Sequence, residues 1–281
     1  MSSTESFSPT VRRRRLSAEL IALREKAQLT LEQAAAKLEW SRAKIANIET
    51  GKRKRPYVTD VELLLNIYGV TDEAHIEAFR DLTRQARTQG WWTKYGDLLD
   101  AYTGFEAEAS SISTYQPNVI PGLLQTPDYA AASARAAINS SDDVERIVDA
   151  RMRRQQILKT ARPPRLWSVI DEAVIARGAG TKVMREQIQH LVEMAERHTN
   201  ITVQLLPFSA GLHAGASGPF VILDFPVAAD PSLVYLETRH DGLYLEEPEV
   251  IADYRTVLGH VQGAALSPAE SVTHLTSLIE E

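Results

Sequence analysis

Apolar residues in the first ninety positions recur every three or four residues, which is typical of short amphipathic helices. The pattern predicts five helices, which cover residues 16–27, two segments between residues 30 and 51, a segment from Thr59 or Asp60 to Gly69, and a segment from Asp72 to about residue 89. Five short helices around one apolar core predict a compact all-α head domain over residues 16–89.

The two helices between residues 30 and 51 carry their own start and stop signals. Thr30 can cap the first helix, and Gln33, three positions later, completes a capping box. Ser41 can cap the second helix, and Gly51 is placed to end it in a left-handed conformation. Two short helices joined by a tight turn are the layout of a helix-turn-helix, whose second helix enters the major groove of DNA.

Beyond residue 90 the pattern changes to short β-rich runs separated by helices. The predicted strands are Ile112–Gln116, Leu166–Ile170, Ile201–Pro207, Phe220–Phe225, Leu233–Glu237 and Gly242–Glu246, with a tight hairpin at residues 239–242. The predicted helices begin with one at Pro127, capped by Thr126, and continue with Asp142–Lys159, Lys182–His198, Glu247–Ala264 and Pro268–Ile279. Clustered strands flanked by helices predict an α+β domain over residues 90–281 with a mostly antiparallel sheet, and hence a multidomain chain.

Positive charge is concentrated in the head. The whole chain has a net charge of −6, but residues 11–57 hold thirteen Arg or Lys against five Asp or Glu, a net of +8, which leaves −14 for the remainder. A basic head on an acidic body indicates a polyanionic partner for the head. Residues 1–15, which end in the run Arg12–Arg15, are predicted to be a disordered basic arm. Such an arm either lies along DNA or adds only non-specific affinity.

Several classes of function lack their sequence signals. The chain has no cysteine, no apolar run near the ~20 residues that cross a bilayer, and no signal peptide pattern, so we expect a cytoplasmic protein without membrane contact. No metal-ligand spacing, nucleophile elbow or nucleotide-binding loop occurs, and the glycine-rich run 211–218 has no lysine. We therefore expect no metal, no cofactor and no catalytic residues. A DNA-tethered enzyme is the alternative to a purely binding protein.

The segment LTLEQAAAKLEWSRAKIANIETGKRKRP resembles the xenobiotic-response-element type of regulator, relatives of the lambda and 434 repressors. The resemblance implies that Arg42, Ala43 and Asn47 lie at base-reading positions of the recognition helix. Arg42 can donate to guanine O6 and N7, Asn47 can pair with adenine, and Ala43 can only touch a thymine methyl group. The alternative for Arg42 and Asn47 is a contact to phosphate. The same resemblance implies a structural ion pair between Arg24 and Glu49.

A second set of residues is placed to contact phosphates at the start of either motif helix or in the basic loop after them. These residues are Thr30, Leu31, Ser41, Lys44, Lys52, Arg53 and Arg55. Such contacts fix register and supply affinity but carry no sequence information.

The segments YQPNVIPGLLQTPDYA, WSVIDEAVIARGAG and ITVQLLPFSAGLHAGASGPFVILDF resemble the C-terminal domain of WhiJ-type actinobacterial regulators and their antitoxin-like relatives. This resemblance implies a small partner protein encoded nearby. Two possibilities for the domain stay open. One is a small-molecule pocket lined by aromatic residues, with the glycine-rich run as a lid. The other is a surface for the partner protein. The aromatic residues are Trp167, Phe220, Tyr235 and Tyr244.

Together these patterns predict a sequence-specific transcriptional regulator that binds a double-stranded DNA operator as a homodimer. The C-terminal domain would then supply dimer contacts and sense a signal or a partner. The alternative is an antitoxin-like autoregulator whose C-terminal domain mainly binds a small cognate protein.

Overall fold

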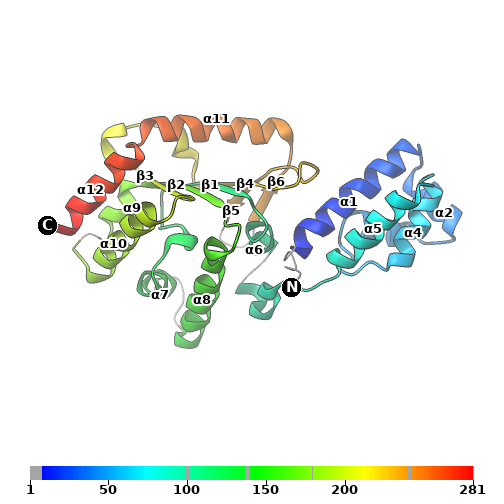
Figure 1. Ribbon diagram of the computed structural model, residues 1–281, viewed down its shortest axis with the longest axis horizontal. Coiled ribbons are helices and arrows are strands. Elements are labelled where there is room, and N and C mark those ends of the chain that lie inside the picture. The colour runs from blue at the N-terminus through cyan, green and yellow to red at the C-terminus, as the bar shows by residue number, and fades with distance from the viewer. Residues whose placement is uncertain (1–7, 99–100, 137–139, 179, 239–241, 281) are drawn as a thin grey trace. The chain divides into compact units, whose positions relative to one another are not determined.

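The computed structural model describes residues 8–98, 101–136, 140–178, 180–238 and 242–280. The chain divides into two compact units, Met1–Lys94 and Tyr95–Glu281, each with its own apolar core (Figure 1). The division lies within a 3₁₀ helix, Trp91–Leu98, slightly beyond the predicted boundary at residue 90. Among the described helices, none is both long enough and apolar enough to cross a membrane.

The first unit is helical, as predicted, and contains α1 (Pro9–Lys26), α2 (Leu31–Leu38), α3 (Arg42–Glu49), α4 (Val58–Ile67) and α5 (Glu73–Ala86). Its core draws on all five helices, through side chains that include Leu20, Ala34, Ile45, Leu64 and Phe79. The two alanine positions of α2 in this core, Ala34 and Ala35, are small enough to let α2 and α3 cross closely.

The N-terminal basic run is not an arm. Helix α1 begins at Pro9, and proline suits the first position of a helix, where its missing N–H is not needed. Val11 and Arg12 are buried, and the guanidinium of Arg13 donates to the carbonyl of Ala86 at 3.2 Å. The prediction of a disordered arm is therefore wrong for residues 9–15, which pack as the first turns of α1 against the end of α5. Residues 1–7 lie outside the described part of the chain.

The start and stop signals of the two motif helices are confirmed. Thr30 and Gln33 form the reciprocal capping box of α2, and the hydroxyl of Ser41 accepts from the backbone N–H of Lys44 at the start of α3. Gly51 has a φ of +68° beyond the end of α3. Helix α4 differs because its cap position is Tyr57, whose side chain makes no capping bond, and neither Thr59 nor Asp60 takes that position.

The second unit is built on a six-stranded sheet with strand order β3-β2-β1-β4-β5-β6. The strands are β1 (Ser111–Gln116), β2 (Arg165–Asp171), β3 (Ile201–Leu206), β4 (Phe220–Asp224), β5 (Leu233–Glu237) and β6 (Gly242–Leu245). Each lies within one or two residues of its predicted position. Strands β1, β2 and β3 run parallel, whereas β4, β5 and β6 pair antiparallel. The predicted α+β fold is confirmed, but the sheet is mixed, since the two helical crossovers make one half parallel. Of the hairpin predicted at residues 239–242, residues 239–241 lie outside the described residues.

Helices cover both faces of this sheet (Figure 1). Helix α11 (Pro248–Ala264) crosses one face and buries Val169, Phe220 and Val234 beneath it. The opposite face carries α6 (Ala101–Glu106), α7 (Pro127–Arg135), α8 (Ser141–Arg154) and α10 (Lys182–Arg197). The remaining helices are α9 (Glu172–Ala176) after β2, α12 (Pro268–Glu280) against β3, and 3₁₀ turns at Gly122–Leu124, Gln155–Lys159, Phe208–Ala210 and Ala214–Ser217.

One buried ion pair joins α6 to α8. Arg154 donates from Nε and Nη2 to the two carboxylate oxygens of Glu106, at 2.9 and 2.8 Å, and the Glu106 side chain is 2% exposed. The ring of Tyr102, one turn earlier in α6, packs 4.3 Å from the ring of Tyr235 on β5. The helix α6 was not predicted from the sequence. A helix of six residues is not stable by itself, so α6 depends on these two long-range contacts.

Candidate nucleic-acid interface

The recognition helix α3 is held by its inner face and presents the predicted base-reading residues outward. Ile45 and Ile48 are buried in the core of the first unit. Arg42, Ala43 and Asn47 are exposed on the other side. This separation follows from helical geometry, because positions 45 and 48 share one face while 42, 43 and 47 do not point into it.

A buried carboxylate fixes the end of α3. Arg24 of α1 donates from Nε to both oxygens of Glu49, at 2.9 and 3.1 Å, and the hydroxyl of Tyr68 donates to Oε1 at 2.6 Å. Arg24 also donates to the carbonyl of Leu29 just before α2. The predicted ion pair is thus present. Tyr68 is a third member of this cluster, which the family resemblance did not indicate. Burial, followed by the hydrogen bond to Glu49, raises the pKa of Tyr68 and keeps its hydroxyl a neutral donor.

The side chain of Arg42 is not isolated on the surface. Its Nε lies 2.5 Å from Oε1 of Glu32, in the first turn of α2, and both side chains are 64% exposed. The two helices of the motif therefore meet through a pair of opposite charges at their N-terminal ends. Neither the pattern of apolar residues nor the family resemblance indicated this contact.

Two of the predicted phosphate contacts are already paired within the head. The amine of Lys44 lies 2.9 Å from Oδ1 of Asp60 and 3.3 Å from the centre of the Trp40 ring. Nη1 of Arg53 lies 3.7 Å from Oδ2 of the same carboxylate. Asp60 is largely buried at the start of α4, so it acts as a common counter-charge for both cations. Any contact of Lys44 or Arg53 with phosphate must compete with Asp60.

The other residues predicted to contact phosphate differ in whether their polar groups are already bonded within the head. The hydroxyls of Thr30 and Ser41 are occupied as helix caps. Thr30 and Leu31 border a shallow hollow between the end of α1 and the start of α2. Lys52 and Arg55 are exposed, and neither forms an ion pair with any described residue.

The basic loop contains two further candidates that the sequence analysis did not single out. Lys54 is exposed like its neighbours. Tyr57 is 54% exposed, with the guanidinium groups of Arg53 and Arg87 at 4.9 and 5.6 Å from its ring centre. An aromatic residue directly after a basic run is a recognisable signal in the sequence, whereas the approach of Arg87 from the end of α5 is not.

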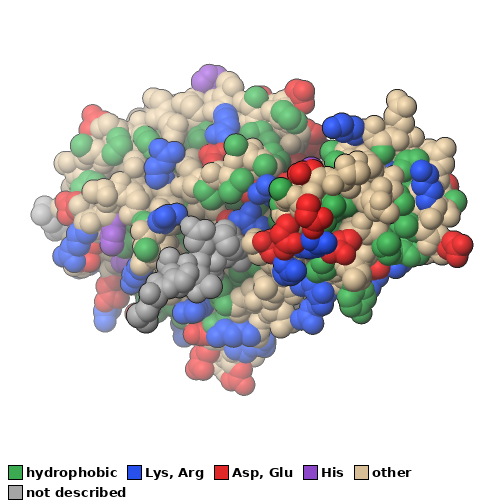
Figure 2. Space-filling model, turned by 45° about the vertical axis from the view of Figure 1, so that its right-hand side comes forward, with side chains coloured by type: hydrophobic (Ala, Val, Ile, Leu, Met, Phe, Trp, Pro, Cys, Tyr) green, Lys and Arg blue, Asp and Glu red, His purple; other side chains and the backbone are tan. Residues whose placement is uncertain are grey.

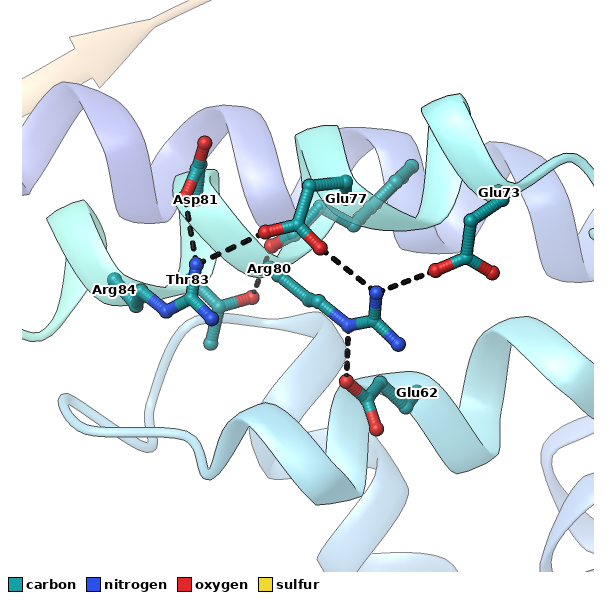
Figure 3. Close-up of polar contacts among 8 residues, drawn as sticks. Glu62, Glu73, Glu77, Arg80, Asp81, Thr83 and Arg84 are labelled. Carbon is teal, nitrogen blue, oxygen red and sulfur yellow. Dashed lines mark hydrogen bonds and ion pairs between the residues drawn. The ribbon is translucent and has the colours of Figure 1, made fainter.

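Another side of the head is acidic and unsuited to phosphate. On α5, Arg80 bonds Glu73 and Glu77 and also reaches Glu62 of α4, while Arg84 bonds Glu77 and Asp81 (Figure 3). Four carboxylates against two guanidinium groups leave this patch net negative. Across the face drawn in Figure 2, basic and acidic side chains are interspersed rather than separated. In the basic loop after α3, Lys52, Lys54 and Arg55 have no carboxylate partner among the described residues, so their charges remain available to phosphate.

The four aromatic residues predicted to line a pocket do not come together. Side chains alternate between the faces of a sheet, and paired residues of adjacent strands share a face. Phe220 packs under α11, and the register places Trp167 on that same face. Tyr235 and Tyr244 pair with each other on the opposite face, 5.1 Å apart. The pocket prediction is therefore wrong, because it ignored strand parity. Phe220 and Tyr235 are buried core residues.

A polar cluster lies instead at the carboxyl ends of the parallel strands. The hydroxyl of Tyr115 on β1 donates to Oδ2 of Asp171 on β2, and Nε2 of His213 lies 3.9 Å from the same oxygen. Asp171 also caps α9, since its Oδ1 accepts from the backbone N–H of Ala173. Burial, then the Asp171 carboxylate, raises the pKa of Tyr115. Carboxyl ends of parallel strands are where open α/β sheets bind ligands, so this edge was a natural place for a site.

The glycine-rich run covers that edge. It leads from β3 across β2 and β1 to β4, and the backbone N–H of Gly215 donates to Nδ1 of His213. A side chain at Gly215 would lie 2.5 Å from the Tyr115 ring, so the loop rests directly on the ring. Among the described residues, no group of three or more His, Asp or Glu side chains is placed to hold a metal ion.

The contacts of Glu49 predict a specific order of stabilities. Replacing Glu49 with alanine removes the buried carboxylate that pairs with the partly buried guanidinium of Arg24, and should destabilise the head by about 3–5 kcal/mol. Tyr68→Phe removes one hydrogen bond and should cost about 1 kcal/mol. Glu73→Ala removes an exposed charge and should change stability by less than about 0.5 kcal/mol. Chemical denaturation of the full chain measures the three shifts, and equal effects of Glu49→Ala and Tyr68→Phe would contradict the assignment.

Comparison with known families matches both units separately. Residues 15–79 match a helix-turn-helix domain, and residues 99–277 match a domain of unknown function, DUF5753. No similar protein was found among curated proteins or among solved structures. The first match, together with the exposed face of α3, indicates that the head binds DNA. The second match covers more than half of the chain, which therefore belongs to the DUF5753 family and carries a helix-turn-helix domain at its N-terminal end.

Proposed function

We propose that the protein is a sequence-specific transcriptional regulator that binds a double-stranded DNA operator as a homodimer in the cytoplasm. The observation that carries the proposal is the recognition helix α3, anchored from inside by Ile45, Ile48 and Glu49 while it presents Arg42, Ala43 and Asn47 to solvent. A helix presented in this way can enter the major groove without any rearrangement of the head. The proposal assigns no reaction to the chain.

Base recognition falls to few side chains in this proposal. Arg42 at the start of α3 reads guanine, Asn47 five residues later reads adenine, and Ala43 contacts a thymine methyl group. Each bidentate contact discriminates by ~1–3 kcal/mol, so one head alone has limited selectivity. Two heads on half-sites about one helical turn apart would supply the rest, which supports the dimer.

Affinity falls mainly to the loop after α3. Lys52, Lys54 and Arg55 are exposed there, and their cations have no carboxylate partner among the described residues. Lys44 and Arg53 contribute less in this proposal, because both already lie beside the carboxylate of Asp60, which offsets part of their positive charge. Backbone N–H groups at the start of α2, next to the hollow at Thr30 and Leu31, complete the phosphate contacts.

The C-terminal domain is proposed to supply dimer contacts and to receive the signal. The division of the aromatic residues between two sheet faces argues against the aromatic pocket considered from sequence. Two large apolar side chains, Phe208 and Leu212, are instead exposed on the loop over the polar cluster. Exposed apolar side chains together in one loop favour a protein contact. The resemblance to WhiJ-type regulators supports the same choice, with a small protein as the partner.

A selection of binding sites from random DNA tests the central proposal. The wild-type chain should enrich two half-sites separated by about one helical turn. Arg42→Ala should lose the preference at one guanine in each half-site, a loss of about 5- to 150-fold in discrimination, and keep the other positions. Enrichment of a single half-site would contradict the dimer. An unchanged motif for Arg42→Ala would contradict the role of Arg42.

The salt dependence of binding tests the division of the cations. Lys52→Ala should weaken binding to all sequences alike and lower the slope of log K against log salt by about 1 unit. Lys182→Ala removes the same charge from an exposed position of α10 and serves as the control, with no change in slope. Lys44→Ala should change the slope less than Lys52→Ala does. Equal slopes for the wild type and Lys52→Ala would exclude the loop from the interface.

Genome-wide mapping of bound DNA distinguishes a regulator of several genes from an antitoxin-like autoregulator. A regulator of several genes should occupy many sites that share the selected motif. The antitoxin-like alternative, in which the C-terminal domain mainly binds a small cognate protein, should occupy only sites beside its own gene. Bound DNA sites that share no sequence motif would contradict both hypotheses.

A further inference from the structure

The contact between Glu32 and Arg42 joins the exposed starts of the two motif helices. Glu32 lies in the first turn of α2, Arg42 is the first residue of α3, and their nearest atoms, Oε1 and Nε, are 2.5 Å apart. Both side chains are 64% exposed. An ion pair with that exposure contributes little to folding, so the stability of the head does not account for it.

The way the pair is made leaves the base-reading edge of Arg42 available. A guanidinium group has five N–H donors in a rigid, planar arrangement. The carboxylate of Glu32 approaches the Nε side, so the edge formed by Nη1 and Nη2 is not needed for the pair. That terminal edge can donate to O6 and N7 of guanine. Glu32 can therefore hold the side chain while Arg42 reads a base.

Holding the side chain matters because arginine is long and flexible. An unrestrained Arg42 would lose rotamer freedom on binding, and it could exchange the guanine for a nearby phosphate. The hydrogen bond from its own backbone N–H, followed by the charge of Arg42, lowers the pKa of Glu32. The lowered pKa favours the ionised carboxylate, which is the form that pairs with Arg42. The anionic form also suits the N-terminal end of α2.

The same carboxylate has a cost for DNA binding. A negative charge beside the groove repels phosphates of any sequence, so it lowers affinity without regard to bases. A residue that weakens general attraction and restrains one base-reading side chain favours selectivity over affinity. These two effects have opposite consequences for specific and non-specific DNA, which makes them separable by experiment.

We propose that Glu32 is a positioning residue for base recognition, which holds Arg42 in the orientation that reads a guanine of the operator. The proposal rests on the proposed function, in which Arg42 contacts a base. It adds a specificity-determining residue that lies on α2, outside the recognition helix.

The test measures binding of full-length variants to the selected operator and to duplexes in which each guanine is replaced in turn. The guanine read by Arg42 is the one whose preference disappears in Arg42→Ala. At this guanine, Glu32→Ala should lower the discrimination ratio at least about threefold, and it should tighten binding to non-specific DNA. Glu32→Gln should keep most of the ratio, because an amide oxygen at this position can accept a hydrogen bond from Nε of Arg42. In the Arg42→Ala background, Glu32→Ala should not change the ratio.

Glu73→Ala is the matched control. Glu73 is also an exposed carboxylate in the first turn of a helix, and it pairs with Arg80 at 2.6 Å on α5 (Figure 3). Its removal changes the net charge by the same amount but touches no base-reading residue. The discrimination ratio should therefore stay at the wild-type value. Circular dichroism should show the same helix content and melting temperature for Glu32→Ala as for Glu73→Ala.

Two outcomes overturn the proposal, and they are distinguishable from failure of the proposed function. An unchanged ratio in Glu32→Ala shows that the pair is incidental, and a higher ratio shows that Glu32 competes with guanine for Arg42. In both cases Arg42→Ala still loses selectivity, so only the inference on Glu32 fails. Loss of the role of Arg42 itself appears as an unchanged ratio in Arg42→Ala, and then both proposals fail.

Discussion

The carboxylate of Glu49 is the point on which the geometry of the head depends. It lies at the end of α3, where it is 2% exposed, and it receives donors from Arg24 of α1 and from Tyr68 at the end of α4. A carboxylate away from water requires such donors, because an unmatched buried charge is strongly destabilising. Three helices are therefore fixed to one residue. The orientation of the recognition helix is set from its inner end, which leaves its outer side chains free to determine what is bound.

The second unit depends on a different constraint, which is the meeting of parallel and antiparallel strands at β1. The loop from β3 must cross the carboxyl ends of the parallel strands to reach β4, and it does so over Tyr115 and Asp171. The absence of a side chain at Gly215 lets the loop rest on the Tyr115 ring. The edge at which related architectures bind ligands is therefore occupied by the chain's own backbone.

Much of the fold follows from local sequence. Thr30, Ser41 and Asp72 cap their helices because their side chains accept from the backbone N–H three residues ahead. Such caps can be recognised from the local sequence alone. The strands were found because Gly and Pro separate runs of β-branched and apolar residues. The parallel half of the sheet was missed because strand direction is decided by connections, not by composition.

The missed features of the candidate site share one property, which is that they depend on residues far apart in the sequence. Asp60 meets Lys44 and Arg53 only once α4 has packed beside α3. Tyr68 reaches Glu49 in the same way. The basic run Arg12–Arg15 looked like an arm because its charge is obvious, whereas the apolar positions that make it helical, Val11 and Leu16, lie at either end of it. Local pattern thus located the motif but not the partners of its charged side chains.

The placement of Asp60 has a consequence for how quickly such a head could search a chromosome. A protein that binds every sequence strongly spends most of its time on wrong sites, so its residence there limits the search. The single negative charge of Asp60 offsets part of the positive charge of Lys44 and Arg53, so it weakens this indiscriminate attraction. If the head binds DNA as proposed, the buried carboxylate shortens each unproductive encounter. Asp60 would then raise the rate at which the head finds its operator, although its side chain contacts no base.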